Sequence, residues 1–161
     1  MPSVDVLRKI ASELEVTFPK LTKDKDIYLS PIVMEVSSRR AYELQIVDGG
    51  SDYTSALEGG IRRENFTVII AILRAFATDS TEQYQRFLKD TTNSIFVIKE
   101  TIIDTLEGSF LIAADMTTPL LTRPLRVINT PPVRKGREQQ GLLIKEVHFL
   151  GGMNEVRPPI E

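Results

Sequence analysis

The run from Phe66 to Phe76 constrains the fold more than any other part of the sequence. Its apolar side chains alternate along the chain, and the residues between them are also mainly apolar. Its many β-branched side chains favour a strand over a helix, and a strand that is apolar on both faces must be covered on both. We therefore predict a long strand inside a sheet, with one face carrying Phe66, Val68, Ile70, Ile72 and Phe76 and the other Thr67, Ile69, Ala71, Leu73 and Ala75.

Apolar residues at helical spacing predict an N-terminal helix over residues 3–15, with Ser3 as its N-cap and Asp5 in its first turn. Pro19 and the charged run that follows it predict a surface loop over residues 17–30. Short segments rich in β-branched or aromatic residues are typical of strands. These segments cover residues 31–36, 42–47, 110–114, 125–129 and 142–150.

The longest helix is predicted over residues 81–107. Ser80 and Gln83 have the spacing of a capping box. Apolar residues then recur three, four or seven positions apart as far as Leu106, and Gly108 supplies a left-handed stop. This helix should pack against the sheet.

Two extended loops are predicted over residues 48–63 and 130–141, because the first contains two glycine pairs and the second follows Pro131 and Pro132. The pair Gly151-Gly152 is expected to mark the end of the ordered core. These elements predict one α+β domain over residues 1–161, with a mixed or antiparallel sheet packed against the helix 81–107.

Composition excludes several classes of protein. Hydrophobic residues make up 42% and charged residues 26% of the chain, so it can bury a core. There is no cysteine, which excludes a disulfide framework, a thiol nucleophile and any cysteine-containing metal site. The N-terminus has no secretory signal pattern, and no stretch is long and apolar enough for a membrane span. We expect a soluble protein made in the cytoplasm, without contact with membranes.

The sequence offers little for catalysis or ligand binding. His148 is the one histidine, in a predicted strand with no serine near it in sequence, so a structural or surface role is expected. The acidic pairs around Asp24 and Asp48 lack the ligand series of an EF-hand. The glycine pairs lack the spacing of a nucleotide-binding loop. We expect no catalytic residue, no metal and no cofactor.

The distribution of charge is more informative. The formal net charge is −2, yet the segment from Met116 to Arg137 has five cations and no acidic residue. Such a segment is either an exposed loop kept soluble by its charges or a surface facing phosphates or an acidic partner. The candidate interface residues are these cations and the nearby arginine pair, namely Arg62, Arg63, Arg123, Arg126, Arg134, Lys135 and Arg137.

The amount of apolar sequence also indicates self-association. A strand that is apolar on both faces and a helix with a broad apolar stripe carry more apolar surface than a monomer of this size needs. Burial between subunits is one outcome, and burial within the core of a single subunit is the other.

The order of these elements resembles that of the tail-terminator or tail-completion proteins of long-tailed bacteriophages. The resemblance covers about residues 42–129. It consists of Tyr42-Glu43-Leu44-Gln45-Ile46-Val47, a glycine-containing loop, the strand that begins Gly60-Ile61-Arg62-Arg63-Glu64-Asn65-Phe66, and a helix ending Leu106-Glu107-Gly108. The long loop from Pro131 to Gly141 and the Gly-Gly segment near the C-terminus depart from the usual pattern of the family.

The resemblance implies a non-enzymatic virion component. Such proteins form a hexameric ring that sits on the last ring of the tail tube and presents its other face to head-completion proteins of the neck. The implied partners are further copies of the chain, the tail tube protein and a head-completion protein, with a passing contact with DNA and no cofactor. The alternative from another class is a small nucleic-acid- or protein-binding module that uses the basic region 123–137.

Overall fold

The computed structural model describes residues 4–22, 24–35, 42–57, 61–76, 81–90, 94–113, 117–138 and 141–156. Three helices and six strands lie in these residues. In chain order they are α1 (Val4–Thr17), β1 (Ile27–Ser30), β2 (Glu43–Leu57), β3 (Ile61–Ala75), α2 (Thr81–Lys89), α3 (Ile95–Leu106), β4 (Arg123–Asn129), β5 (Arg134–Lys135) and β6 (Leu142–Val156).

All six strands belong to one mixed sheet. The strand order is β1-β2-β3-β6-β4, and β5 also pairs with β6. Only β1 and β2 are parallel among the described pairs, and the rest are antiparallel. The ladder between β3 and β6 is continuous from Ile61↔Val156 to Ala75↔Leu142. The predicted α+β class with a mixed sheet is confirmed.

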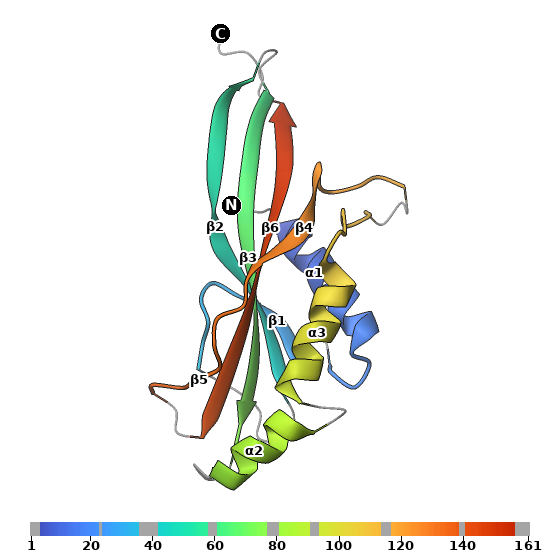
Figure 1. Ribbon diagram of the computed structural model, residues 1–161. Coiled ribbons are helices and arrows are strands. Elements are labelled where there is room, and N and C mark those ends of the chain that lie inside the picture. The colour runs from blue at the N-terminus through green and yellow to red at the C-terminus, as the bar shows by residue number, and fades with distance from the viewer. Residues whose placement is uncertain are drawn as a thin grey trace.

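The helices cover part of one face of the sheet. Figure 1 shows α1 and α3 beside the lower half of the long strands and α2 at the lower end, while β2, β3 and β6 continue beyond the helices. Ile98 and Ile102 of α3 belong to the same buried cluster as Val68, Ile70 and Ile72 of β3. A smaller buried cluster lies on the other face, with Val33 packed against Ala71, Leu73, Ala75, Leu142 and Ile144.

The strand predicted over 66–76 is confirmed. It is the apolar part of β3, in which Phe66, Val68, Ile70 and Ile72 are fully buried on the helix side. Ala71 and Leu73 are buried on the opposite side. Both faces are covered, as the alternation of apolar residues requires.

The single long helix predicted over 81–107 is wrong, because two shorter helices occupy this range. Ser94 has extended backbone angles and caps α3, accepting a hydrogen bond from the Val97 N–H at 3.2 Å. The sequence from Asp90 to Ser94 consists of short polar residues, whose side chains compete with helical backbone hydrogen bonds. The predicted stop at Gly108 is confirmed by its φ of 81°.

The loop predicted over 48–63 is wrong for the residues that the structure describes. These residues continue β2 and begin β3 as an antiparallel pair, with a bulge between Asp48 and Ser51. Gly50 has a φ of 100°, and its N–H donates to the Asp48 carboxylate at 2.9 Å. The glycine pair therefore forms a bulge within a strand. Residues 58–60 lie outside the described residues.

Three other expectations need correction. The strand predicted over 31–36 is replaced by β1 at residues 27–30, inside the predicted loop 17–30, where Ile27 and Ser30 are buried. The segment 110–114 forms only an isolated bridge between Ile112 and Pro119 in its described part. The last strand does not stop before Gly151 but runs to Val156.

The N-terminal helix is confirmed with its apolar stripe buried, and it ends two residues later than predicted. The predicted caps Ser3 and Ser80 lie outside the described residues. No helix in the part of the chain that the structure describes is long and apolar enough to cross a bilayer.

Candidate assembly interface

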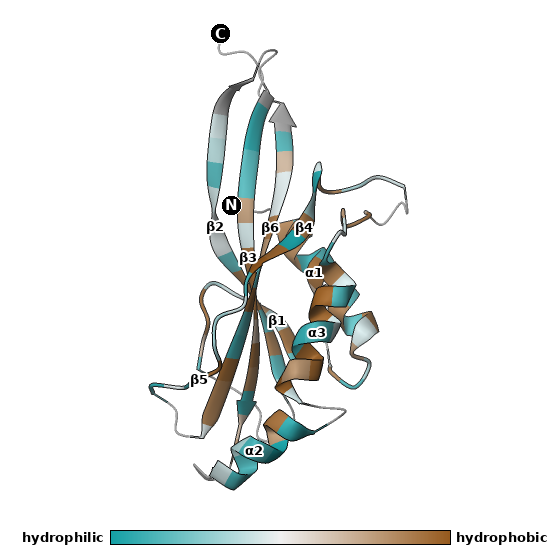
Figure 2. Cartoon of the chain, in the orientation of Figure 1, coloured by the Kyte–Doolittle hydropathy of each residue, from teal (hydrophilic) through white to brown (hydrophobic). Residues whose placement is uncertain are grey.

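The part of the sheet beyond the helices, which we call the blade, is formed by residues 48–57 of β2, 61–65 of β3 and 151–156 of β6. The sequence changes character where the blade begins. Residues 62–65 of β3 are Arg-Arg-Glu-Asn, whereas the residues from Phe66 onward are mainly apolar. Figure 2 shows the same change, with hydrophilic colours prevailing in the blade and apolar residues concentrated in the lower half of the sheet. A sheet that is polar on both faces is suited to contact with water or a polar partner.

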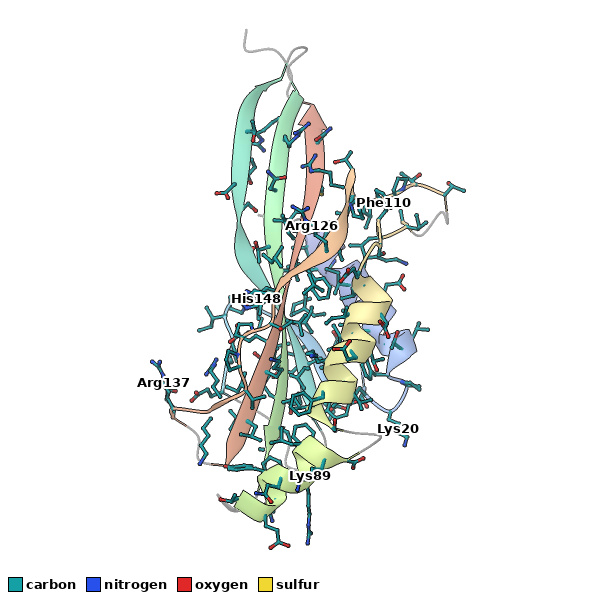
Figure 3. The ribbon with its side chains drawn as sticks, viewed as in Figure 1. Lys20, Lys89, Phe110, Arg126, Arg137 and His148 are labelled. Atoms are coloured by element: carbon teal, nitrogen blue, oxygen red, sulfur yellow. The ribbon has the colours of Figure 1, made fainter. Side chains whose placement is uncertain are left out.

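The structure separates the seven predicted interface cations into distinct groups. Strand register places Arg63, Arg123 and Arg126 on the face of the sheet away from the helices, because Arg123 pairs with Gly152 and Arg126 with Leu150. Arg62 projects to the opposite face. The third group lies on the body. It consists of Arg134 and Lys135, which pair with Ile144 and Leu143 of β6, and of Arg137 in the turn that follows β5. Figure 3 shows Arg126 well separated from Arg137.

Arg123 is the best-positioned cation of the first group. Its Nη2 donates to the carbonyl oxygen of Glu64 at 2.8 Å, and its Nη1 donates to Oδ1 of Asn154 at 3.0 Å. A Cβ added to Gly152 would lie 2.3 Å from the Arg123 Nε and Nη2 atoms. The guanidinium can therefore lie across β6 only because residue 152 has no side chain.

A pocket of about 260 Å³ lies beside this guanidinium. It is lined by Asn65, Arg123, Pro124, Arg126, Leu150 and Gly151. Burial, and then the positive charge of Arg63, lower the pKa of Arg123 from its ordinary value. No acidic side chain among the described residues forms an ion pair with Arg63 or Arg126. The site is thus a concentration of positive charge with room for an anionic group.

The opposite face of the blade holds a different arrangement around Glu64, which is 5% exposed. Its Oε1 accepts a hydrogen bond from Ser51 Oγ at 2.8 Å and one from the Tyr53 hydroxyl at 3.3 Å. The Arg62 guanidinium lies 4.4 Å from the centre of the Tyr53 ring. Arg62 thus packs on Tyr53, on the face opposite Arg63, Arg123 and Arg126, and does not belong to that group of cations.

Arg134 belongs to an ion cluster on the body of the molecule. It lies 3.4 Å from the Glu146 carboxylate and 3.9 Å from that of Glu35. Glu146 also contacts His148 Nε2 at 3.0 Å. The structural or surface role predicted for His148 stays a prediction. The described residues contain no cluster of His, Asp or Glu able to hold a metal ion.

The loop predicted over 130–141 is largely attached to the sheet in its described part. The Glu35 carboxylate accepts the backbone N–H groups of Arg137 and Glu138, each at 2.6 Å. Lys145, which is 7% exposed, donates to the carbonyl oxygens of Thr130 and Pro131 at 3.2 and 2.5 Å. Burial, with a further contribution from Lys99, lowers the pKa of this amine. Residues 139 and 140 lie outside the described residues.

Two parts of this site were not predicted from the sequence. Gly152 was predicted as the end of the core, and Asn154 was not singled out. The signal for Gly152 was weak, because a glycine pair in isolation indicates a turn. Its role depends on Arg123, which is distant in sequence and reaches it only through the β4–β6 pairing.

The exposed large apolar side chains do not form one surface within a single element. They include Val16 on α1, Ile32 after β1, Phe96 on α3 and Ile128 on β4. Single exposed apolar residues are common on soluble proteins. The predicted burial of apolar surface between subunits therefore stays a prediction.

Comparison with known proteins gives a likeness of fold. No protein-family model matches the sequence. No curated protein sequence matches it either. Among solved structures, the chain is similar to one from the "Virion of native gene transfer agent (GTA) particle", with a TM-score of 0.53 and 9% sequence identity. The match covers 94% of this chain and 96% of the other. At this identity the likeness establishes a shared fold across nearly the whole of both chains.

Proposed function

We propose that this chain is a structural component of a phage-like virion, of the tail-terminator kind. In this role it forms a ring on the end of a tail tube and presents another surface to the head-completion proteins of the neck. The observation that carries the proposal is the likeness in fold, over nearly the full length of both chains, to a chain of a gene transfer agent virion. The order of elements had indicated the same class of protein.

The shape of the subunit supports an assembly role. The helices and the apolar half of the sheet form a packed body, and the blade, in which hydrophilic residues prevail, extends from it. Subunits of a cyclic ring associate through two different surfaces on each copy. A blade with two distinct faces and two edges offers such surfaces. This role requires association and no reaction, and His148 and Glu64 are engaged in an ion pair and a hydrogen bond within the subunit.

Mass measurement in solution and electron microscopy of the purified full chain test this proposal. We expect concentration-dependent association to one closed size, seen as rings in the micrographs. A protein that stays monomeric at every concentration, and that forms no ring when tail tubes are supplied, would contradict the proposal.

A second candidate function rests on the cluster of Arg63, Arg123 and Arg126. These three cations lie on one face without an ion pair to a described acid, which suits contact with the phosphates of DNA. Retention on a DNA column that falls steeply with salt, and falls further in the Arg63→Ala and Arg126→Ala variants, would support a nucleic-acid-binding module. Arg134→Ala is the matched control, because Arg134 is already paired with Glu146.

A further inference from the structure

The two sides of the sheet carry opposite charge. The β2 segment from Tyr42 to Leu57 contains three acidic residues and no cation, whereas the segment containing β4 and β5 has cations and no acid as far as Arg137. In the sheet order, β2 and β4 lie on opposite sides of the β3–β6 pair. The chain therefore has an acidic edge and a basic edge on one sheet.

The acidic edge is open over much of its length. β1 pairs only with residues 44–47 of β2, so no described strand pairs with the part of β2 from Asp48 to Leu57 on the side away from β3. Asp52 is exposed on this edge. No hydrogen bond or ion pair to its carboxylate is formed by the described residues. Asp48 differs, because its carboxylate accepts the Gly50 N–H within the bulge.

We call a row the set of residues that lie directly opposite one another across adjacent strands. Strand register places Asp52 in the same row of the sheet as Arg123. Asp52 pairs with Asn65, Asn65 with Gly152, and Gly152 with Arg123. Residues directly opposite each other in a ladder project from the same face. Asp52 and Arg123 therefore end the same row at its two sides, on the face away from the helices.

The neighbouring row has a related arrangement. Arg126 pairs with Leu150, which pairs with Thr67. On the β2 side this row ends at the bulge, where a Cβ on Gly49 would lie 2.8 Å from the Thr67 side chain. Both arginines of β4 thus lie in rows that end at the acidic segment of β2.

We propose that Asp52 of one copy of this chain pairs with Arg123 and Arg126 of the next copy, so that the acidic edge of each subunit docks on the basic edge of its neighbour. This inference names the contact surfaces of the ring proposed above and rests on that function. A ring generated by rotation keeps each residue at its own height along the axis. The proposed contact requires the strands to run along the ring axis, so that the row that ends at Arg123 in one copy continues at Asp52 of the next.

This contact is formed by side chains and not by backbone pairing between the two edges. The backbone of β4 at Leu125 is already occupied, since its N–H donates to Ser109 and its carbonyl oxygen accepts from Gly108. The pocket beside Arg123 has room for a carboxylate, and an Arg–carboxylate pair can be bidentate. An incoming Asp52 would also offset the repulsion between Arg63 and Arg123.

Disulfide trapping tests the contact in a chain that has no cysteine of its own. Within one subunit the ends of the Asp52 row lie roughly 14 Å apart, taking about 4.8 Å per strand spacing. A disulfide needs Cα atoms within about 7 Å. A disulfide in Asp52→Cys/Arg123→Cys must therefore join two copies, and we expect a ladder of cross-linked species that ends at one closed size.

Two controls and one substitute variant make the trapping decisive. Asp52→Cys/Lys89→Cys places the second cysteine on α2, at the far end of the molecule (Figure 3), and should give no ladder. Efficient dimers from Asp52→Cys alone would indicate a two-fold contact and overturn the inference. Should Arg123→Cys unfold the protein, Asp52→Cys/Arg126→Cys replaces it, because Arg126 is exposed.

Charge exchange provides an independent measurement. Asp52→Arg and Arg126→Glu should each weaken self-association at least roughly tenfold by placing like charges together, and an equimolar mixture of the two variants should regain assembly as an alternating ring. Wild-type protein that never associates would overturn both the inference and the proposed function. A wild-type ring that neither reversal affects overturns the inference alone. Loss of DNA retention in Arg126→Glu, with unchanged association, would assign this face to DNA and also overturn it.

Discussion

The same three strands form two regions with opposite chemistry. In the body, β2, β3 and β6 are buried beneath helices on one face, and β3 and β6 also contribute to a smaller apolar cluster on the other. In the blade the same strands carry Ser51, Tyr53, Glu64 and Asn154, held by hydrogen bonds between side chains. The ladder continues through both regions. Backbone pairing therefore sets the shape, whereas side-chain burial determines which half provides stability.

The largest expected effect is a loss of stability caused by a substitution in the body. Ile70→Ala removes a fully buried side chain from β3 and should lower the free energy of unfolding by about 2–5 kcal/mol. Thr54→Ala, on an exposed position of the blade, is the matched control and should change it by less than about 0.5 kcal/mol. Urea unfolding measures both. Equal losses in the two variants would contradict the division of roles between body and blade.

The boundary between the regions can be tested with two adjacent glycines. A Cβ at Gly151 would lie 2.8 Å from Phe66 and 2.9 Å from Leu125, so Gly151→Ala should cost about 1–3 kcal/mol through overpacking. The three atoms nearest to a Cβ at Gly152 would all belong to the guanidinium of Arg123, a flexible side chain that can move away.

Gly152→Ala should therefore cost less stability than Gly151→Ala while weakening self-association. Unfolding midpoints and sedimentation of both variants provide the comparison. A larger loss of stability in Gly152→Ala would place the boundary of the body one residue further along β6.

A smaller effect concerns the break between α2 and α3. Ser94→Ala removes the side-chain oxygen that accepts the Val97 N–H, which should cost about 1 kcal/mol of body stability. Ser94→Asp is the control, because aspartate is also a good N-cap, and it should retain most of the stability. Thermal unfolding followed by circular dichroism measures the difference.

The smallest effect appears only at alkaline pH. Burial raises the pKa of Tyr28 and of Tyr42 to about 12, from an ordinary value of 10. The unfolded chain releases these protons first, so the stability that the neutral phenols contribute is complete below pH 10 and is lost as the pH rises toward 12. Tyr28→Phe and Tyr42→Phe should lose less stability over this range in urea unfolding. An unchanged dependence on pH in both variants would contradict burial of these hydroxyl groups.

Periodicity predicted the body well because burial leaves a repeating signal. The alternation from Phe66 to Phe76 and the apolar stripe of α1 both correspond to buried faces. The blade has no such signal, since apolar residues do not recur at a sustained period in its sequence, and its residues therefore resembled a loop. Gly49, Gly50, Gly151 and Gly152 strengthened that reading, although all four lie within strands.

The candidate site was predictable only in part. Charge counting identified its arginines, but the basic segment in the sequence is divided in the fold. Arg123 and Arg126 lie on the face of the sheet away from the helices, where the blade begins, whereas Arg134 pairs with Glu146 and Glu35 on the body. The partners of Arg123 come from β3 and β6. Contacts between segments so distant in sequence depend on strand register, which composition does not contain.

The unbroken ladder between β3 and β6 has a mechanical consequence. Its fifteen consecutive residue pairs join the far end of the blade to the strand segments on which α3 packs, with no bulge between them. The bulge at Asp48 to Ser51 lies instead in β2. A force applied to the end of the blade would thus be transmitted to the body along β3 and β6, which form a stiff pair. β2 can bend at its bulge.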